Sequence, residues 1–453
     1  MFIYEVWVVV AETMFQSRDP YLELRSRYVM NGVALHHPVT IERGENAILY
    51  DVNGRRYIDF TCGIGVTSLG HANKELINVA EEQLRKLWHV CVMVMNYRPY
   101  VELAEKLAKI SPGGSEKQVL LQNSGSEAIE NAIKIARQVT GRIYVIAYEN
   151  SFHGRGTYGY ALAATGKYKP YKIGIDPIIP GVELIPYPYC YRCIFKQEYP
   201  ECSLVCLDYL EKWFTYSRVP LERVAALVIE MVQGEGGFIV APIDYVRELK
   251  KLLDKYGVLL VDDEVQCGWS RTGKMWAIEH YGVDPDILVT AKAIANGLPL
   301  SAIIGKKDLM EKTLPGSFGG TYGGNPVSCA VASKVVDIML RDRLPDRAAV
   351  LGETIKKKLN ELYDKFKLVG DVRGLGVMQA IELVKDRKTK EPAIDEVVKV
   401  VNKAREKGLL LLRAGLYLNV IRLHPPLTIE EENLEKGLEI LEESIKEVEA
   451  ESS

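Results

Sequence analysis

Residues 287–305, ILVTAKAIANGLPLSAIIG, begin as an apolar strand and then place a lysine, Lys292, where the strand should run out into a tight turn at Asn296 and Gly297. An ammonium at the end of a buried strand costs free energy unless its charge is paired, or unless its pKa falls and it works as an amine. The simpler interpretation is a surface lysine that extends from a loop into water. A lysine that forms a Schiff base should instead be accompanied by an anion-binding turn, a carboxylate for a pyridine nitrogen and an arginine for a substrate carboxylate.

Short apolar runs alternate with helical segments from about residue 100 to residue 320. The runs are KQVLLQNS, RIYVIAYE, AALVIEMV, GVLLVDDEV and DILVTAK. Runs too short for helices and separated by helical segments are typical of a parallel sheet with crossover helices, whose ligands bind at the carboxyl ends of the strands. The pattern predicts an α/β fold in which residues 91–330 form a large domain around a mostly parallel sheet.

The two ends of the chain predict a second, smaller domain. The string VTIERGENAILYDVNGRRYIDF alternates polar and apolar residues around Asn53 and Gly54, a pair typical of a two-residue hairpin turn. After about residue 330, amphipathic helices alternate with the strand candidates GLGVMQAIELV and YLNVIRLHPP. We expect residues 331–453 to form an α+β small domain that the antiparallel hairpin of residues 1–90 joins.

Composition excludes several classes of partner. The chain has 453 residues, of which 57 are basic and 60 acidic, so its net charge of −3 favours neither nucleic acid nor an anionic membrane. The first residues, MFIYEVWVVVAET, are too short an apolar stretch to span a bilayer and are poorly built for a signal peptide. We expect a buried strand there or a true start at Met14 rather than Met1, and a cytoplasmic protein.

Two strand ends carry groups of the kind that should accompany a Schiff-base lysine. In VLLQNSGSEAIENAIKIARQVTG a strand ends at Asn123, Gly125 allows a tight turn, and Ser126 can cap the helix that follows. Free N–H groups and the helix dipole there make an anion site, although a simple cap has the same pattern. In GVLLVDDEVQCGWSRTG a buried strand runs into three carboxylates around Asp263, one of which could face a pyridinium nitrogen. Helix capping, a surface ion pair or a metal site would also explain these carboxylates.

Three further segments contain complementary groups. AALVIEMVQGEGGFIVAP ends a strand with Glu230 and Glu235, and SFHGRGTYGY places Phe152 and His153 in a loop where an aromatic ring could stack on a flat cofactor. GGTYGGNP can bring Thr321 and backbone N–H groups near an anion. Together these sites favour a reactive Lys292 over a surface lysine.

The chain resembles the class III, or ω-amino acid, aminotransferases, which are pyridoxal phosphate enzymes of fold type I. The matching strings are NSGSEAIENAIKIAR, FHGR, VIEMVQGEGG, VDDEVQCGWSRTG, AKAIANGLPLSAIIG, GGTYGGNP and IRLHPPL. They follow the order of the family and cover nearly the whole chain from about residue 30. The resemblance implies a fold type I structure and pyridoxal 5′-phosphate as the cofactor.

The resemblance also implies a role for each matching cofactor residue. Lys292 would form the internal aldimine and later carry the proton of the substrate carbon, while Asp263 would pair with the pyridine nitrogen and Gln266 would contact the phenolic oxygen. Phe152 would stack on the ring, with His153 beside it. The phosphate would be bound by Gly125 and Ser126, helped by Thr321 from the neighbouring subunit, which implies a homodimer or a larger homo-oligomer.

Four residues are implied to bind the substrate. Arg422 would hold the α-carboxylate of 2-oxoglutarate or glutamate, and Glu235 would neutralise it for substrates without that group. Glu230, at the end of the strand AALVIEMV, is predicted to bind the substrate together with Arg422 and Glu235. Arg137 matches an arginine for a distal carboxylate, but it lies about 16 Å along an ideal helix from Ser126, so a solvated helix arginine is the alternative.

The chain departs from the family pattern at Met231, Val232, Cys267 and Trp269. Trp269 could shape the pocket, which leaves the substrate open. Four of the eight cysteines fall in CYRCIFKQEYPECSLVC, at Cys190, Cys193, Cys202 and Cys206. They could bind zinc or an iron–sulfur cluster, form disulfides or stay free thiols, because spacing alone does not decide between these.

We therefore predict an aminotransferase that moves an amino group from an ω-amino acid such as 4-aminobutyrate to 2-oxoglutarate by a ping-pong mechanism. Its partners would be small amino donors and 2-oxo acids. The alternatives are an ornithine or lysine ω-aminotransferase and an amino-acid racemase on the same scaffold. A metal-binding module leaves Lys292, Asp263 and Arg422 unexplained, and a nicotinamide dehydrogenase lacks its glycine-rich motif.

Overall fold

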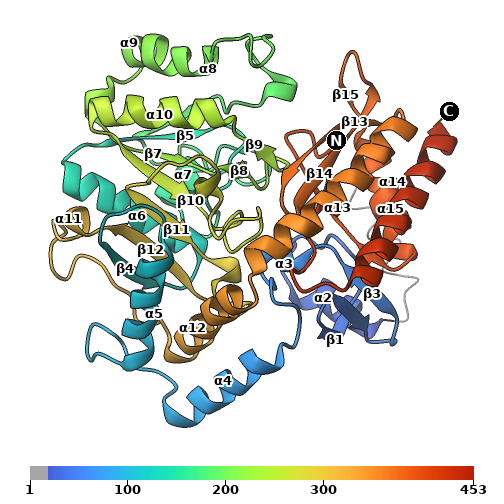
Figure 1. The fold of residues 1–453 in the computed structure, drawn as a ribbon, viewed down its shortest axis with the longest axis horizontal. Helices are drawn as coiled ribbons and strands as arrows, with labels where there is room; N and C mark the ends of the chain where they lie inside the picture. Colours follow the sequence, from blue (N-terminus) through green and yellow to red (C-terminus); the bar gives the residue numbers. More distant parts are fainter. Residues whose placement is uncertain (1–18, 453) are drawn as a thin grey trace.

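The computed structural model describes residues 19–452. The predictions of an N-terminal strand or of a start at Met14 lie outside the described residues. The chain forms a large body around one sheet and a smaller body that combines the N-terminal hairpin with the C-terminal third (Figure 1). The predicted domain boundaries stay predictions, and residue 330 falls inside α12 (Pro326–Arg341).

The large sheet has seven strands in the order β4-β12-β11-β10-β7-β5-β6. Their bounds are β4 Lys117–Gln122, β5 Tyr144–Tyr148, β6 Val182–Ile185, β7 Val224–Ile229, β10 Leu259–Asp263, β11 Ile287–Thr290 and β12 Ser301–Lys306. Every neighbouring pair from β11 to β6 is parallel, and β12 runs antiparallel to both β11 and β4. The prediction of a mostly parallel sheet is thus confirmed. Among the described residues, β12 is the one strand of this sheet that runs against the others, and it contains the second apolar run of residues 287–305.

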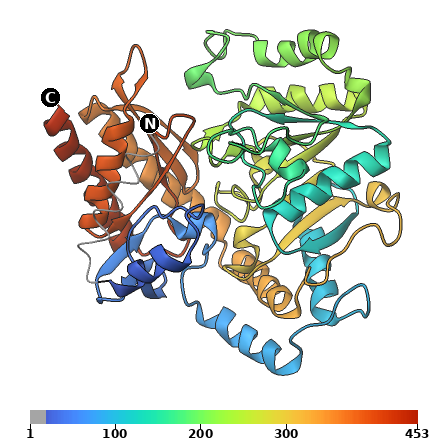
Figure 2. The same cartoon turned by 180° about the vertical axis from the view of Figure 1, so that it is seen from behind.

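Helices cover both faces of this sheet, which explains its continuous apolar strands. Alternate residues of β7 show the two sides: Ala226 and Val228 pack with α6 (Gly125–Thr140), whereas Leu227 and Ile229 pack into the larger cluster on the other side. Figure 2 shows the side that α6 covers. The other helices of this body include α4 Lys74–Lys86, α5 Arg98–Ile110, α7 Tyr160–Ala164, α10 Ile243–Tyr256, α11 Lys307–Met310 and α12, which packs on α4 and α5.

The smaller body contains two sheets and three long helices. The first sheet has the order β1-β2-β3-β16 and the second β13-β14-β18-β17, with β15 beside β14. The strands are β1 Ile41–Glu45, β2 Ile48–Asp51, β3 Arg56–Asp59, β13 Val369–Leu375, β14 Met378–Asp386, β15 Glu391–Pro392, β16 Leu409–Leu410, β17 Leu412–Ala414 and β18 Val420–Leu423, and the helices are α13 Leu344–Lys365, α14 Ile394–Glu406 and α15 Glu431–Ser452. Because β3 pairs in parallel with β16, the hairpin is tied to the C-terminal third.

The hairpin between β2 and β3 differs from its prediction. A two-residue turn was expected at Asn53 and Gly54, but the N–H of Asp51 donates to the carbonyl of Arg55, so the loop has one residue more and begins at Val52. The N–H of Gly54 donates to the carbonyl of Asp51, and Gly54 has φ +82°. A type I turn followed by a left-handed residue is the usual three-residue hairpin loop, and glycine accepts that backbone without strain.

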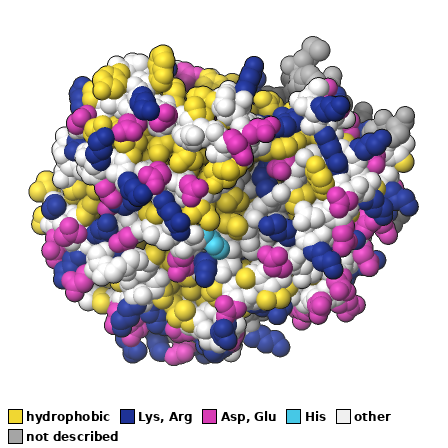
Figure 3. All heavy atoms as spheres, turned by 45° about the horizontal axis from the view of Figure 1, so that its top comes forward, with side chains coloured by type: hydrophobic (Ala, Val, Ile, Leu, Met, Phe, Trp, Pro, Cys, Tyr) yellow, Lys and Arg dark blue, Asp and Glu magenta, His cyan; other side chains and the backbone are white. Residues whose placement is uncertain are grey.

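Shorter elements complete the described chain. They are α2 Pro20–Tyr28, α3 Cys62–Gly65, α8 Val205–Asp208, α9 Thr215–Ser217, β8 Val232–Gln233, β9 Ile239–Val240 and the short turns η1 Cys190–Arg192, η2 Tyr209–Phe214, η3 Leu221–Arg223, η4 Ala277–His280 and η5 Lys292–Ala295. Basic and acidic side chains are interspersed over the face in Figure 3. Among residues 19–452, no helix combines the length and the apolar character needed to cross a membrane.

Candidate active site

The carboxyl ends of the parallel strands meet at one cavity of about 320 Å³. Eight of the predicted residues line it: Gly125, Ser126, Phe152, His153, Glu230, Asp263, Gln266 and Lys292. They lie at or after the ends of five different strands, β4, β5, β7, β10 and β11, which belong to one sheet although they are distant in sequence. This is the position at which open α/β sheets bind ligands.

One end of the cavity is the start of α6. The cap of this helix is Ser124, whose hydroxyl accepts from the N–H of Glu127, while the carboxylate of Glu127 accepts from the N–H of Ser124. The prediction that Ser126 is the cap was therefore wrong, and Ser126 lies in the first turn after Gly125. Because the first N–H groups of a helix have no partner within it, those of Gly125 and Ser126 can bind an anion.

The loop after β5 packs closely on this helix start. A Cβ atom on Gly154 would lie 2.4 Å from Oγ of Ser126, and the backbone there has φ +133°, so only glycine fits. The hydroxyl of Thr165 donates to the carbonyl of Gly154 and accepts from the N–H of His153, which fixes the loop. This holds Phe152 and His153 at the cavity wall.

Asp263 is the one carboxylate of its acidic string that lines the cavity. Its Oδ2 accepts a hydrogen bond of 2.6 Å from Nδ1 of His153, and its Oδ1 accepts one of 3.0 Å from the N–H of Val265. Neighbouring residues of a strand point to opposite sides, so Asp262 and Glu264 face the core instead. Burial raises the pKa of Asp262 well above its usual value, and it raises that of Glu264 to about 7.

The carboxylate of Glu230 links two loops by accepting hydrogen bonds from the main chain of each. Its two carboxylate oxygens accept hydrogen bonds of 2.9 Å from the N–H groups of Phe152 and Gly234. Burial raises its pKa to about 7, with Asp263 adding to the rise and His153 opposing it. Both oxygens are therefore engaged by the main chain, and direct binding of a substrate by Glu230 stays a prediction.

Lys292 lies at the cavity and not on the surface, so the surface-lysine interpretation was wrong. The chain leaves β11 and places Lys292 at the start of η5 with φ +51°, a conformation that costs free energy for a residue other than glycine. Burial lowers the pKa of its ammonium, while Glu235, Asp263 and Glu230 oppose this. A lowered pKa makes the neutral amine more available for reaction.

Arg422 and Glu235 form an ion pair beside the cavity. Nη1 of Arg422 donates to Oε1 of Glu235 at 2.8 Å and to Oε1 of Gln266 at 3.4 Å, and Gln266 itself lines the cavity. The exposed fractions of the two ion-paired side chains are 5% and 16%. Burial alone would raise the pKa of Glu235, but Arg422 and then Lys167 outweigh it, and the pKa falls to about 2.

Two predicted residues lie elsewhere in this subunit. Arg137 is in the last turn of α6, where its guanidinium lies 4.6 Å from the ring centroid of Tyr160, and it does not line the cavity. Thr321 is exposed in the loop before α12, also outside the cavity. The structure does not bring either of them to the site of its own chain.

Sequence reasoning missed two cations near the site. Arg155, from the quoted string FHGR, lies over Tyr171 at 5.3 Å, and Tyr171 packs on Phe152 with ring centroids 5.1 Å apart. Lys167 is buried and contributes to the low pKa of Glu235. The motif itself was a signal for Arg155, whereas nothing in the sequence marked Lys167.

Comparison with known proteins decides the family. The family model "Aminotransferase class-III" matches residues 29–445. The chain belongs to the class III aminotransferases. It is 43% identical to 5-aminovalerate aminotransferase DavT of Pseudomonas aeruginosa, with 96% of this chain and 100% of the relative covered, and 40% identical to 4-aminobutyrate aminotransferase GabT of Escherichia coli, with 95% and 99% covered.

Two further similarities bear on the chemistry of this class III enzyme. It is 41% identical to the leucine/methionine racemase of Thermococcus litoralis, with 91% of each chain covered. The solved ornithine aminotransferase of Toxoplasma gondii, described with pyridoxal phosphate at its active site, superposes with a TM-score of 0.83, 30% identity and 96% of each chain covered. The chain is therefore a pyridoxal-phosphate-dependent aminotransferase with the expected fold type I, and it acts on small amino and oxo acids.

The residues of the class III site fit this cofactor. The N–H groups at the start of α6 suit its phosphate, and the carboxylate of Asp263, oriented by His153, suits its pyridine nitrogen. Phe152 and Val265 line the cavity, where they can contact the faces of a flat ring. A Cβ atom on Gly125 would lie 3.1 Å from Val265, so glycine keeps this space open. The Lys292 amine, which can form a Schiff base with the cofactor, completes the groups that the cofactor needs.

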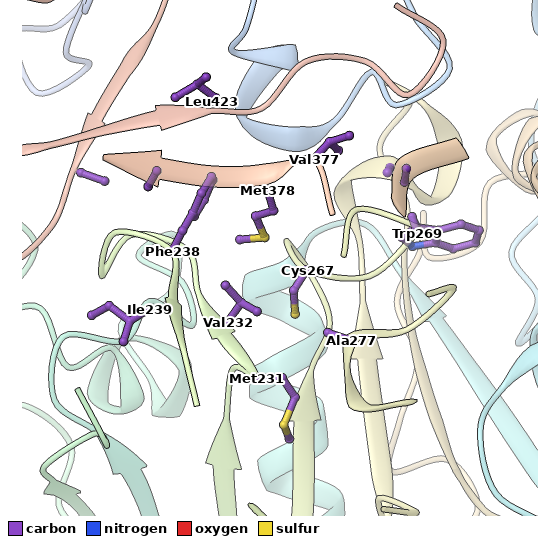
Figure 4. Close-up of a cluster of buried hydrophobic side chains, with 14 of the residues drawn as sticks. Met231, Val232, Phe238, Ile239, Cys267, Trp269, Ala277, Val377, Met378 and Leu423 are labelled. Carbon is purple, nitrogen blue, oxygen red and sulfur yellow. The ribbon is translucent and has the colours of Figure 1, made fainter. Parts of the chain in front are cut away.

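The departures from the family pattern lie in the core of the aminotransferase. Figure 4 shows Met231, Val232, Cys267 and Trp269 within a buried cluster. Trp269 is 1% exposed, donates from Nε1 to the hydroxyl of Thr290, and does not line the cavity. The expectation that Trp269 shapes the pocket was therefore wrong.

The cysteine segment contains free thiols. Cys190, Cys193, Cys202 and Cys206 form no disulfide, and within residues 19–452 no group of three or more potential ligands is arranged to hold a metal ion. Burial raises the pKa of the Cys190 thiol to about 11 and that of Cys206 to about 12, so both are protonated at neutral pH. In the structure the four thiols are free, and the metal and disulfide alternatives for this segment stay predictions.

Proposed function

We propose that the enzyme transfers the amino group of an ω-amino acid, such as 4-aminobutyrate or 5-aminovalerate, to 2-oxoglutarate in two half-reactions at one site. The ion pair between Arg422 and Glu235 carries this proposal. An arginine beside the cavity that is neutralised by a glutamate can serve two kinds of substrate in turn. The names of the two aminotransferase relatives support an ω-amino donor.

Five residues that line the cavity have a part in this reaction. The bound cofactor supplies the aldehyde that captures the amine and the ring that stores an electron pair. Lys292 provides the amine that holds the cofactor and then moves the proton of the substrate carbon, for which its lowered pKa is suited. Asp263 keeps a positive charge on the ring nitrogen, and Gln266 binds the phenolic oxygen. Gly125 and Ser126 bind the phosphate.

The ion pair works as a charge gate. An ω-amino donor has no α-carboxylate, so it meets an Arg422 that Glu235 has already neutralised. The α-carboxylate of a 2-oxo acid competes for the same guanidinium, because arginine binds carboxylates with paired charge-assisted hydrogen bonds. Displacement of Glu235 thus lets the second substrate bind where the first did.

The carboxylate at the far end of the donor needs a separate cation. Arg137 was predicted for this role, but Arg155 is better placed, because it lies over Tyr171 next to the cavity wall at Phe152. Arg155 is exposed, so a carboxylate can reach it. We assign the distal carboxylate to Arg155.

A second copy of the chain would complete the site. The segment after α4 exposes Trp88, Met93, Val94 and Met95, and α4 stands out from the large body in Figure 1. His89 packs against Tyr322 with ring centroids 5.4 Å apart, so this apolar segment adjoins the loop of Thr321. Burial of such a patch in a homodimer would carry Thr321 to the phosphate of the partner. The free thiols of all eight cysteines suit the expected cytoplasmic location.

The test is a pair of assays on the purified holoenzyme. Incubation with 5-aminovalerate or 4-aminobutyrate and 2-oxoglutarate should yield glutamate in proportion to the donor consumed. The similarity to a leucine/methionine racemase makes racemisation the second candidate. Inversion of one enantiomer of leucine without any oxo acid, and no glutamate from the ω-amino donors, would favour that candidate and refute the transfer.

A further inference from the structure

Lys167 is a buried cation that the reaction described above does not use. It follows Gly166, which pairs with Glu149 as an isolated bridge, and its own N–H donates to the carbonyl of Ser151. The residue is 8% exposed, and its Nζ donates to the carbonyl of Gly415 at 3.2 Å. An ammonium has three donors, and burying one with a single carbonyl partner is costly. The cost requires a compensating charge nearby.

That charge is Glu235. Gly415 accepts from Lys167 through its carbonyl, and its N–H donates to the main-chain carbonyl of Glu235 at 3.0 Å, so one residue ties the two together. Their charges interact accordingly: Lys167 helps to lower the pKa of Glu235, and Glu235 opposes the fall that burial causes in the pKa of Lys167. Arg422 donates to the same carboxylate.

The local charge balance suggests what Lys167 does. Arg422 and Lys167 are the two cations that lower the pKa of Glu235 most, ahead of Lys292, and one carboxylate cannot pair with all of them. A substrate carboxylate bound to Arg422 would leave Glu235 for Lys167, so that each of these two cations has a carboxylate partner, but only if Glu235 can reach it. A displaced carboxylate left in this buried place without a partner would be strongly unfavourable.

We propose that Lys167 is the second cation of the gate and receives the Glu235 carboxylate when a 2-oxo acid occupies Arg422. The main chain of Glu235 is hydrogen-bonded to Gly415, which also accepts from Lys167, so the change that we propose is a rotation of the Glu235 side chain. Lys167 is thereby a positioning residue, because it acts on the substrate through Glu235. The inference rests on the proposed function, since it assumes that a substrate carboxylate competes for Arg422.

Binding of 2-oxoglutarate to the holoenzyme without any amino donor tests this directly, because no turnover follows. We expect Lys167→Met to raise the calorimetric Kd at least about tenfold, since the displaced carboxylate loses its partner. Lys172→Met is the matched control. Lys172 is also buried, in the same segment, but its Nζ donates to the carbonyl of Ala163 at 3.0 Å, and the carboxylate that acts on its pKa is Asp176 and not Glu235. That control should change the Kd by less than about twofold.

Two further variants separate the gate from simple structural damage. In a Glu235→Gln background no carboxylate is displaced, so adding Lys167→Met should change the Kd by less than about threefold. Lys167→Arg keeps the charge and should restore much of the affinity. If Lys167→Met does not yield folded holoenzyme, judged by its cofactor absorbance and Tm, Lys167→Gln replaces it.

The outcomes are distinct. An unchanged Kd in Lys167→Met, or a loss that persists in the Glu235→Gln background, overturns the role of Lys167. A wild-type enzyme that neither binds 2-oxoglutarate nor forms glutamate refutes the proposed function, and the inference then falls with it. Tight binding by the wild type together with a loss confined to the variants that keep Glu235 supports both.

Discussion

Replacing Glu235 with glutamine should invert the preference of the gate. The pKa of Glu235 falls to about 2 from an ordinary 4.5, and at about 1.4 kcal/mol per unit the surrounding cations favour its charged form by on the order of 3 kcal/mol. A carboxylate that takes Arg422 must displace this interaction. Glu235→Gln removes the competing charge, so 2-oxoglutarate and L-glutamate should bind at least about tenfold more tightly. The ω-amino donor should react more slowly, because it meets an unneutralised Arg422.

Single-turnover half-reactions, followed by the absorbance of the bound cofactor, measure both effects on one preparation. We expect the ratio of kcat/KM for L-glutamate to that for 4-aminobutyrate to rise by about 300-fold at most, the equivalent of the whole interaction. Glu432→Gln, on the exposed first turn of α15, is the control with the same chemical change. Equal effects of Glu235→Gln on both donors would refute the gate.

Three other perturbations follow from the structure. Glu264 has a pKa raised by burial to about 7, so it stabilises the fold below pH 4.5 and loses that contribution as pH rises through about 7; Glu264→Gln should flatten the fall of Tm between about pH 5 and about pH 8, and an unaltered profile would contradict the assignment. Gly154→Ala should weaken cofactor binding about tenfold or more, because its Cβ would press on Ser126, whereas Gly174→Ala, also at positive φ but in open space, should not; titration of the apoenzyme measures both. Trp88→Asp should elute as a monomer in size-exclusion chromatography, and an activity assay on that monomer should show reduced activity. A fully active monomer would exclude a site shared between subunits.

The sequence predicted those parts of the fold and site that depend on local pattern. Apolar runs that end in Asp263, Glu230 or Lys292 are visible as strands, and the sheet then brings their ends together. The hairpin was also visible, but the length of its turn was not, because the same Asn-Gly pair suits a two-residue turn and the three-residue loop that Gly54 closes.

Features set by tertiary packing could not be read in the same way. The choice between Ser124 and Ser126 as helix cap depends on where the helix begins, and a shift of two residues is within the uncertainty of a helix end read from local pattern. Trp269 lies in the core, where it packs against Trp276, a residue that no local pattern connects with it. Lys167 is linked to Glu235 only through Gly415, which is far from both in sequence, so no local signal could reveal the pair.

The most direct test of the account is the absorbance spectrum of the holoenzyme beside that of Lys292→Ala, before and after addition of 4-aminobutyrate or 5-aminovalerate without any oxo acid. We expect a visible band that requires Lys292 and that disappears when the donor is added, because the amino group of the donor has then been transferred. A band that is the same in Lys292→Ala, or one that neither donor alters, would contradict it.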